Sequence, residues 1–180
     1  MTQPAPHAPA LGSLLVALQF GLLAALGLLA GLAWRQAGTA PMPASTLPLD
    51  ALLLAGVSMA LGLWALACNR PGNFHIRPLP KTDGALVQHG PYRWIRHPMY
   101  TALLLLAAAI VRLTASAAGA GASVVSLAGL PLGTWAVLCW AALLGVLVLK
   151  ARVEEVALRL HHPGYAAYCE RSRRFLPGLW

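Results

Sequence analysis

Four long apolar runs constrain this chain more than any other feature of its sequence. They cover residues 11–34, 48–68, 98–114 and 131–150, and they consist largely of Leu, Ala, Val and Gly. A helix needs about 20 apolar residues to cross the roughly 30 Å hydrocarbon core of a bilayer, and its internal hydrogen bonds satisfy the backbone there. The runs therefore predict an all-α integral membrane protein with about four transmembrane helices, of which the third is short.

The composition agrees with a membrane protein. The mean hydropathy is +0.66, and only 10% of the 180 residues are charged, whereas soluble domains carry about 25% charged residues. The first run lacks a basic segment before it and is longer than the apolar core of a signal peptide, so we expect it to be retained as a helix. We expect residues 1–180 to form a single membrane-embedded domain.

The distribution of basic residues predicts the topology. The formal net charge is +8, and the basic residues flank the apolar runs, which indicates membrane lipids rather than nucleic acid as their partner. Residues 69–97 hold five basic residues and residues 150–180 hold six, whereas the opposite side holds only Arg35 and Arg112, one near each remaining connection. By the positive-inside rule both basic segments, and with them both termini, are cytoplasmic. The polar segments 69–97 and 151–180 should therefore meet on one side of the membrane.

Two connections differ in how clearly they can be interpreted. Residues 69–97 contain four prolines and three glycines, so we expect a looped path with little helix. Residues 115–130 are rich in small side chains and could be a loop, an interfacial helix or an extension of the third span. The three cysteines have no paired spacing, which predicts neither a disulfide framework nor a metal site.

The densest polar and aromatic stretch of the chain is GPYRWIRHPMY, residues 90–100. Pro98 suits the first turn of the helix that follows, since its missing N–H would be unpaired there. The free N–H groups of that turn, with Tyr92, Arg96 and His97 nearby, could seat a carboxylate or phosphate. The alternative is an interfacial anchor in which Arg and Trp lie at headgroup level.

Glu154 and Glu155 follow the fourth apolar run, on a helix that we expect to continue beyond the membrane. One interpretation pairs Glu155 with Arg159 and Glu154 with Lys150, each four residues away. Adjacent helical residues point about 100° apart, so one carboxylate should be structural and the other should contact a cationic ligand group. The sequence leaves open which is which.

Two further patterns lie near the ends of the chain. Pro163 and a following glycine should start a short helix that carries Tyr165 and Tyr168 on one face, either packed on the membrane surface or closing a pocket. Gly27 and Gly31 form a GxxxG pair in the first run, which is compatible with helix packing and a homodimer.

In combination, GPYRWIRHPMY, the two adjacent glutamates and the tail PGYAAYCERSRRFLP resemble the isoprenylcysteine carboxyl methyltransferase family, which is related to the membrane phospholipid methyltransferases. The resemblance covers residues 62–180, and the stretch before residue 90 is similar to the small bacterial members. It implies an S-adenosylmethionine-dependent integral membrane methyltransferase of the bacterial inner membrane. The cofactor would lie between the pre-helix loop and the C-terminal segment on the cytosolic side, and a lipophilic acceptor would arrive from the bilayer.

The resemblance also implies roles for individual residues. Catalytic roles would belong to Arg93, Glu154 and Glu155. Cofactor contacts would come from Gly90, Pro91, Tyr92, Arg96, His97, Tyr100 and one glutamate, expected as Glu154, that holds the cofactor ammonium. Substrate contacts would come from Trp94, Tyr165, Tyr168 and Arg174.

The identity of the acceptor stays open at this level, because a carboxylate, an amine and a thiol are all compatible with the sequence. Two alternative functions also remain. One is an NADPH-dependent membrane reductase of related architecture. The other is a non-enzymatic small membrane subunit in which the Gly27 and Gly31 face and the interfacial arginines are the important features.

Overall fold

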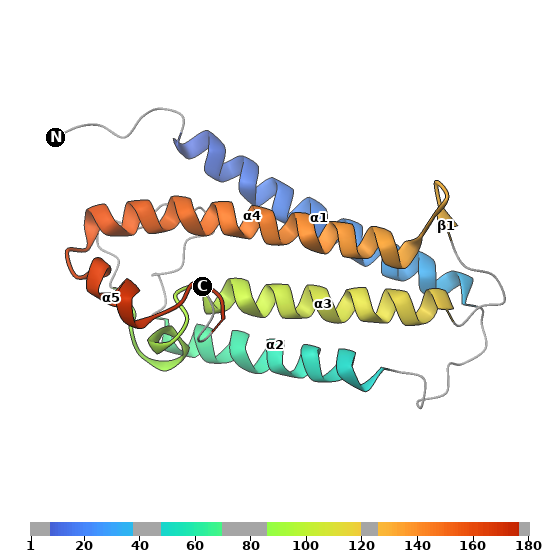
Figure 1. The fold of residues 1–180 in the computed structure, drawn as a ribbon, viewed down its shortest axis with the longest axis horizontal. Helices are drawn as coiled ribbons and strands as arrows, with labels where there is room; N and C mark the ends of the chain where they lie inside the picture. The colour runs from blue at the N-terminus through green and yellow to red at the C-terminus, as the bar shows by residue number, and fades with distance from the viewer. Residues whose placement is uncertain (1–7, 38–47, 70–85, 120–125, 177–180) are drawn as a thin grey trace. The chain divides into compact units, whose positions relative to one another are not determined.

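Four long helices dominate the structure, a computed structural model that describes residues 8–37, 48–69, 86–119 and 126–176. The helices are α1 (Ala8–Gln36), α2 (Leu49–Cys68), α3 (Pro98–Gly119) and α4 (Leu132–His161) (Figure 1). Each contains a stretch long and apolar enough to cross a membrane. The prediction of an all-α integral membrane protein with four spanning helices is thereby confirmed.

The helix bounds refine those expected from the apolar runs. Helix α3 begins at Pro98 and continues to Gly119, so the first part of the ambiguous stretch 115–130 is helical. Its last part forms a hairpin of β1 (Ser126–Leu127) and β2 (Leu130–Pro131), while residues 120–125 lie outside the described part. The hairpin turns at Ala128 and Gly129, both with positive φ, as a two-residue turn of this kind requires. Helix α4 runs on to His161, as expected.

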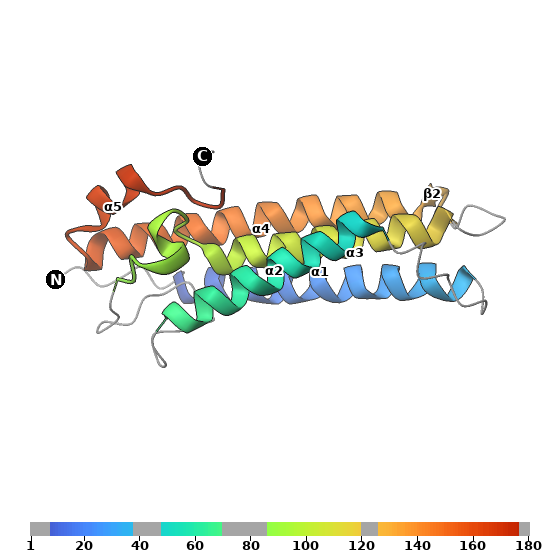
Figure 2. The same cartoon turned by 90° about the horizontal axis from the view of Figure 1, so that it is seen from below.

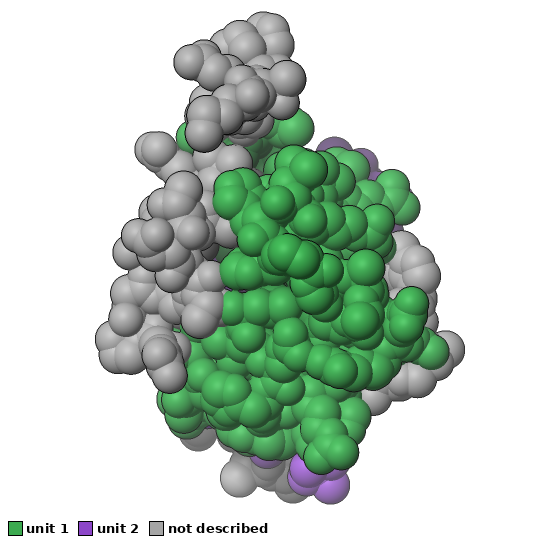
Figure 3. Space-filling view, turned by 90° about the vertical axis from the view of Figure 1, so that its left-hand side faces the viewer, with its two compact units in different colours: residues 1–19, 60–101, 145–180 green, residues 20–59, 102–144 purple. Residues whose placement is uncertain are grey.

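The chain separates into two compact units, coloured differently in Figure 3. Unit 1 contains residues 1–19, 60–101 and 145–180, and unit 2 contains residues 20–59 and 102–144. Every long helix contributes to both units. All residues predicted for the site belong to unit 1. The single domain expected from the sequence stays a prediction.

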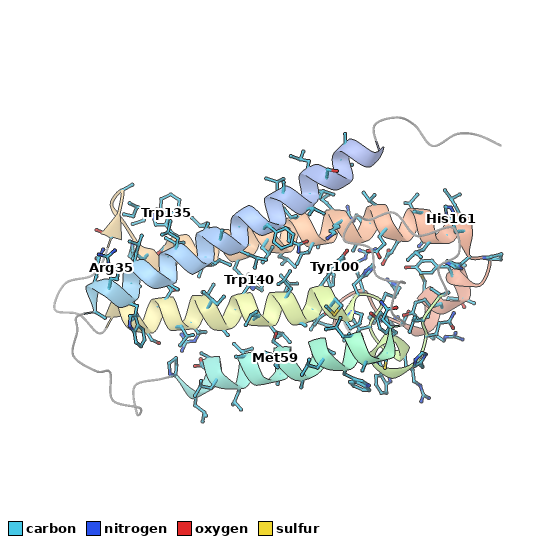
Figure 4. The ribbon with its side chains drawn as sticks, turned by 180° about the vertical axis from the view of Figure 1, so that it is seen from behind. Arg35, Met59, Tyr100, Trp135, Trp140 and His161 are labelled. Carbon is cyan, nitrogen blue, oxygen red and sulfur yellow. The ribbon has the colours of Figure 1, made fainter. Side chains whose placement is uncertain are left out.

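Polar contacts within unit 2 join its helices. Ser58 in α2 donates a hydrogen bond of 2.7 Å to the carbonyl of Ala102 in α3. Trp140 in α4 (labelled in Figure 4) donates one of 3.0 Å to the carbonyl of Leu104. Between apolar helices, such hydrogen bonds add to the specificity of packing.

Arg112, which the charge count assigned to the side of the connection after the third run, lies within α3. It forms a 2.6 Å ion pair with Asp50 in the first turn of α2. Both side chains are about half exposed. The pair therefore contributes little to stability.

Unit 1 adds two short helices to the ends of the long ones. The 3₁₀ helix η2 (Gly90–Arg93) immediately precedes α3, and α5 (Tyr165–Arg171) follows α4. Figures 1 and 2 both show α5 near the end of α4, with the stretch after it leading toward the beginning of α3. The expected short helix after Pro163 is thus present.

Candidate functional site

The stretch before α3 and the stretch after α5 are joined through their backbones. Ile95 and Arg173 form a parallel β-bridge. The amide of Arg96 donates to the carbonyl of Arg173 at 2.7 Å, and the amide of Arg173 donates to the carbonyl of Trp94 at 2.8 Å. The two polar segments therefore meet, as expected, and the side chains they carry gather around the end of α4.

Glu155 lies at the centre of this gathering. Its side chain is only 5% exposed and accepts hydrogen bonds from Arg96 Nε at 3.0 Å and from Arg174 Nη2 at 2.7 Å. His97 Nε2 lies 3.3 Å from the same carboxylate. The pairing of Glu155 with Arg159 was wrong, because Arg159 is exposed and forms no ion pair with it in the described residues. Glu155 pairs instead with Arg96 and Arg174, which are 59 and 19 positions away in the sequence.

Arg96 also fastens the tail. Its Nη1 donates to the carbonyl of Ser172 at 2.6 Å and to that of Cys169 at 3.3 Å. A planar guanidinium suits such a task because its donors are arranged in a rigid fork. Thr101 in the first turn of α3 adds a 2.7 Å hydrogen bond to the carbonyl of Phe175. These bonds hold the C-terminal segment against the start of α3.

Glu154 has a different environment from its neighbour. Its side chain is 31% exposed, it accepts a 2.9 Å hydrogen bond from the hydroxyl of Tyr100, and it lies 3.6 Å from His97 Nδ1. Glu154 attracts Lys150 electrostatically, but the two form no salt bridge in the described part of the chain, where Lys150 donates its hydrogen bond to Gln19 instead. No guanidinium there pairs with Glu154. Of the two glutamates, Glu154 is the more exposed one and the one without a guanidinium partner among the described residues.

Aromatic rings adjoin this carboxylate. The rings of His97 and Tyr100 stack with centroids 5.2 Å apart and planes 1° from parallel. Phe175 lies at 6.1 Å from the first and 6.5 Å from the second. Tyr100 is labelled in Figure 4. Aromatic faces beside a carboxylate are a suitable environment for a cation.

Gly90 is required by the packing of η2 on α2. Its φ is +61°, and a Cβ at this position would overlap Sγ of Cys68 and come within 3.2 Å of Nε1 of Trp64. Only glycine adopts this backbone conformation without strain. The backbone at Gly90 therefore approaches α2 closely, and the close approach to a cofactor that we predicted for Gly90, Pro91 and Tyr92 stays a prediction.

Replacing Gly90 with alanine should lower the free energy of unfolding by about 2 kcal/mol or more, because left-handed strain of about 1–2 kcal/mol adds to the overlap with Cys68. Thermal unfolding in detergent, followed by tryptophan fluorescence, measures the change. A Cys68→Ala change in the same protein should restore part of the loss. Gly27→Ala is the matched control, since a Cβ there meets nothing within 4 Å. Equal stability of the Gly90→Ala protein and the wild type would contradict the packing requirement.

Tyr165 and Tyr168 of α5 are both buried, and their rings meet edge to face at 5.8 Å. The hydroxyl of Tyr168 donates to the carbonyl of Tyr92 at 2.6 Å, which joins α5 to η2. The hydroxyl of Tyr165 has no hydrogen-bond partner among the described residues. Their contacts are those of packing residues, and the substrate role predicted for them stays a prediction.

The phenols outside the spanning segments remain protonated at neutral pH. Burial, and next the negative charge of Glu154, raises the pKa of Tyr92 to about 12. Burial also raises the pKa of Tyr165 and of Tyr168 above the usual 10.0. None of the three can act as a phenolate base under physiological conditions.

Arg93 and Trp94 are exposed, and Arg93 forms no salt bridge with either glutamate in the described part of the chain. The Arg93 guanidinium lies 5.9 Å from the ring of Trp94, which in turn meets Trp64 of α2 at 6.0 Å. This arrangement is compatible with the interfacial anchor that was the alternative interpretation of the motif. Their catalytic and substrate roles stay predictions.

One residue near the site was overlooked in the sequence. Gln19 of α1 accepts a 2.9 Å hydrogen bond from Lys150 Nζ, across 131 positions of the chain. The sequence did contain an indication of this contact. Gln19 is an amide within an otherwise apolar run, and such residues commonly form hydrogen bonds between helices in membranes.

Comparison with known proteins gives one family match. Residues 51–162 match the model described as the isoprenylcysteine carboxyl methyltransferase (ICMT) family. The matched range is more than half of the chain, includes the motif at 90–100 and both glutamates, and ends before α5. Neither the curated proteins nor the solved structures contain a significant match.

Proposed function

The chain belongs to the isoprenylcysteine carboxyl methyltransferase family, and we propose that it transfers a methyl group from S-adenosylmethionine to a hydrophobic or lipid-like acceptor at the cytosolic face of the membrane. The family implies methyltransferase activity in general. One observation carries the finer proposal: Glu154 presents a carboxylate that no guanidinium neutralises in the described residues, beside the stacked rings of His97 and Tyr100.

The residues present fit the proposed cofactor. S-adenosylmethionine, when bound, supplies a methyl group activated on a sulfonium, and it also carries an ammonium and a carboxylate. Glu154 would hold the ammonium through a charge-assisted hydrogen bond. The aromatic rings beside Glu154, those of His97, Tyr100 and Phe175, would lie close to the sulfonium.

The other contribution of the protein would be to position the cofactor and the acceptor. Methyl transfer is an in-line displacement, so orientation and exclusion of water supply most of the rate. The Glu155 cluster with Arg96, Arg174 and His97 holds the tail and the histidine ring in place around Glu154. A carboxylate or thiolate acceptor is already nucleophilic and needs no nucleophilic side chain of the protein. An amine acceptor would need to lose a proton, for which Glu154 is the candidate base.

Calorimetry with S-adenosylhomocysteine tests the proposal directly. The wild type should bind this product, and Tyr100→Phe, which removes the hydroxyl bonded to Glu154, should bind it more weakly. Arg159→Ala is the control, since Arg159 is exposed and forms no salt bridge with Glu155 in the described residues. Lipid extracts of cells with and without the protein should also differ in a species one CH₂ heavier by mass spectrometry. A wild type that does not bind S-adenosylhomocysteine would remove the support for this function.

The proposed membrane face predicts a labelling pattern. With the native cysteines replaced, a cysteine at Ala166, exposed on α5, should react with an impermeant maleimide only when the cytoplasmic side is accessible. Gly84, which lies outside the described residues, probes the other polar segment in the same way. Intact cells and inverted membrane vesicles provide the two orientations. Labelling of either cysteine in intact cells would reverse the topology.

A further inference from the structure

Lys150 is a buried cation within a spanning helix. It is the last residue of the fourth apolar run and lies within α4, and it is only 4% exposed. In the described residues it donates one hydrogen bond, to Gln19 Oε1 at 2.9 Å, and its Nζ lies 5.1 Å from the centroid of the Tyr100 ring. All three residues belong to unit 1.

The direct contacts of Lys150 carry no negative charge. An amide oxygen and an aromatic face both stabilise an ammonium without neutralising it. Glu154 attracts Lys150 electrostatically, but no carboxylate of the described residues forms a salt bridge with it. An ammonium has three N–H donors, of which the described contacts use one. Burial of an ammonium is costly, and ionisable side chains in spanning helices commonly mark ligand sites.

The surroundings of Lys150 indicate which kind of ligand could pair directly with its charge. Leu18 precedes Gln19 and Leu149 precedes Lys150 in the chain, and these leucines are 45% and 52% exposed. The surface beside Lys150 is therefore apolar. Lys150 precedes Glu154 by one helical turn on the same face of α4, about 6 Å along the axis. A ligand whose charged end reached Lys150 would therefore have a hydrocarbon part against the apolar surface and a head close to Glu154.

We propose that Lys150, Gln19 and Tyr100 form a binding site for the anionic oxygen group, carboxylate or phosphate, of a lipophilic ligand. If the proposed function holds, this ligand is the methyl acceptor. Only that identification rests on the proposed function. Lys150 contributes the charge, Gln19 holds the ammonium in place, and the Tyr100 ring links the site to Glu154.

Lysine-selective NMR can observe the site directly, because the chain contains only two lysines, Lys81 and Lys150. The protein carries ¹³Cε-lysine in phosphatidylcholine nanodiscs, and a Lys81→Arg variant assigns the two signals. Dodecanoate and dodecyl phosphate are the probes, and dodecanamide is their neutral control. We expect the Lys150 signal to shift saturably with one or both anions and not with the amide. A shift with one anion only identifies the group that binds. A Lys150 signal that does not shift with either anion, or that shifts equally with the amide, overturns the proposal.

Variants separate binding from a structural role. Gln19→Leu should weaken binding of the effective anion about fivefold, by loss of one hydrogen bond to the ammonium. Lys150→Met should abolish the thermal stabilisation that the anion gives to the wild type, whereas Arg152→Met, which removes an exposed cation of the same helix, should retain it. Stabilisation of the Lys150→Met protein equal to that of the wild type overturns the site.

Calorimetry with S-adenosylhomocysteine on the same proteins distinguishes failure of this site from failure of the proposed function. Unchanged affinity of Gln19→Leu for S-adenosylhomocysteine supports a site for the acceptor. A loss of that affinity in Lys150→Met without any response to the anions assigns the lysine to the cofactor and overturns the inference. If the anions shift the Lys150 signal in a wild type that does not bind S-adenosylhomocysteine, the anion site stands and the proposed function fails.

Discussion

Replacing Glu155 with glutamine is expected to lower the free energy of unfolding by about 3–5 kcal/mol, because removal of one member of a buried ion network leaves its partners uncompensated. Arg96 and Arg174 have side chains only 11% and 15% exposed, and both donate to this carboxylate. Had Glu155 paired only with Arg159 on the surface, the same change would cost a few tenths of a kcal/mol. The expected loss is therefore large because of the partners that the fold supplies.

Thermal unfolding in detergent measures this loss, and trypsin reports where it occurs. The tail contains arginines at 171, 173 and 174, and their cleavage should accelerate when the tail is released from the start of α3. Arg159→Gln, on the same helix, is the matched control and should leave both measurements unchanged. Stability and cleavage of the Glu155→Gln protein like those of the control would show that the network does not hold the tail.

Replacing Glu154 with glutamine is expected to weaken S-adenosylhomocysteine binding by about 10- to 100-fold, the effect of a charge-assisted hydrogen bond to an ammonium. The fold should be little affected, because glutamine has nearly the same shape and can still accept the bond from the Tyr100 hydroxyl. Calorimetry gives the affinity, and thermal unfolding confirms that the protein is intact.

A second ligand provides the control for this prediction. Methylthioadenosine lacks the ammonium, so the wild type and the Glu154→Gln protein should bind it equally. Equal affinity of both proteins for S-adenosylhomocysteine would remove Glu154 from the cofactor site. Together, the two glutamine variants should separate a residue that holds the structure from a residue that holds a ligand, although they are adjacent in sequence.

The sequence by itself determined the class of fold and the position of its main elements. Apolar runs of sufficient length predict spanning helices because a bilayer allows no other backbone arrangement for them. Pro98 marked the first residue of α3, since proline is tolerated there and disfavoured in a helix interior. The motif at 90–100 and the two glutamates led to the family, which the match over residues 51–162 shows.

Only the tertiary structure decided which side chains meet. Helical periodicity tells which residues share a face, and it therefore offered Lys150 and Arg159 as partners of the two glutamates. It does not tell how each helix is rotated against its neighbours or where a loop returns. Glu155 instead binds Arg96, 59 positions away, and Lys150 binds Gln19, 131 positions away. Such contacts depend on packing between distant segments, which local sequence patterns do not encode.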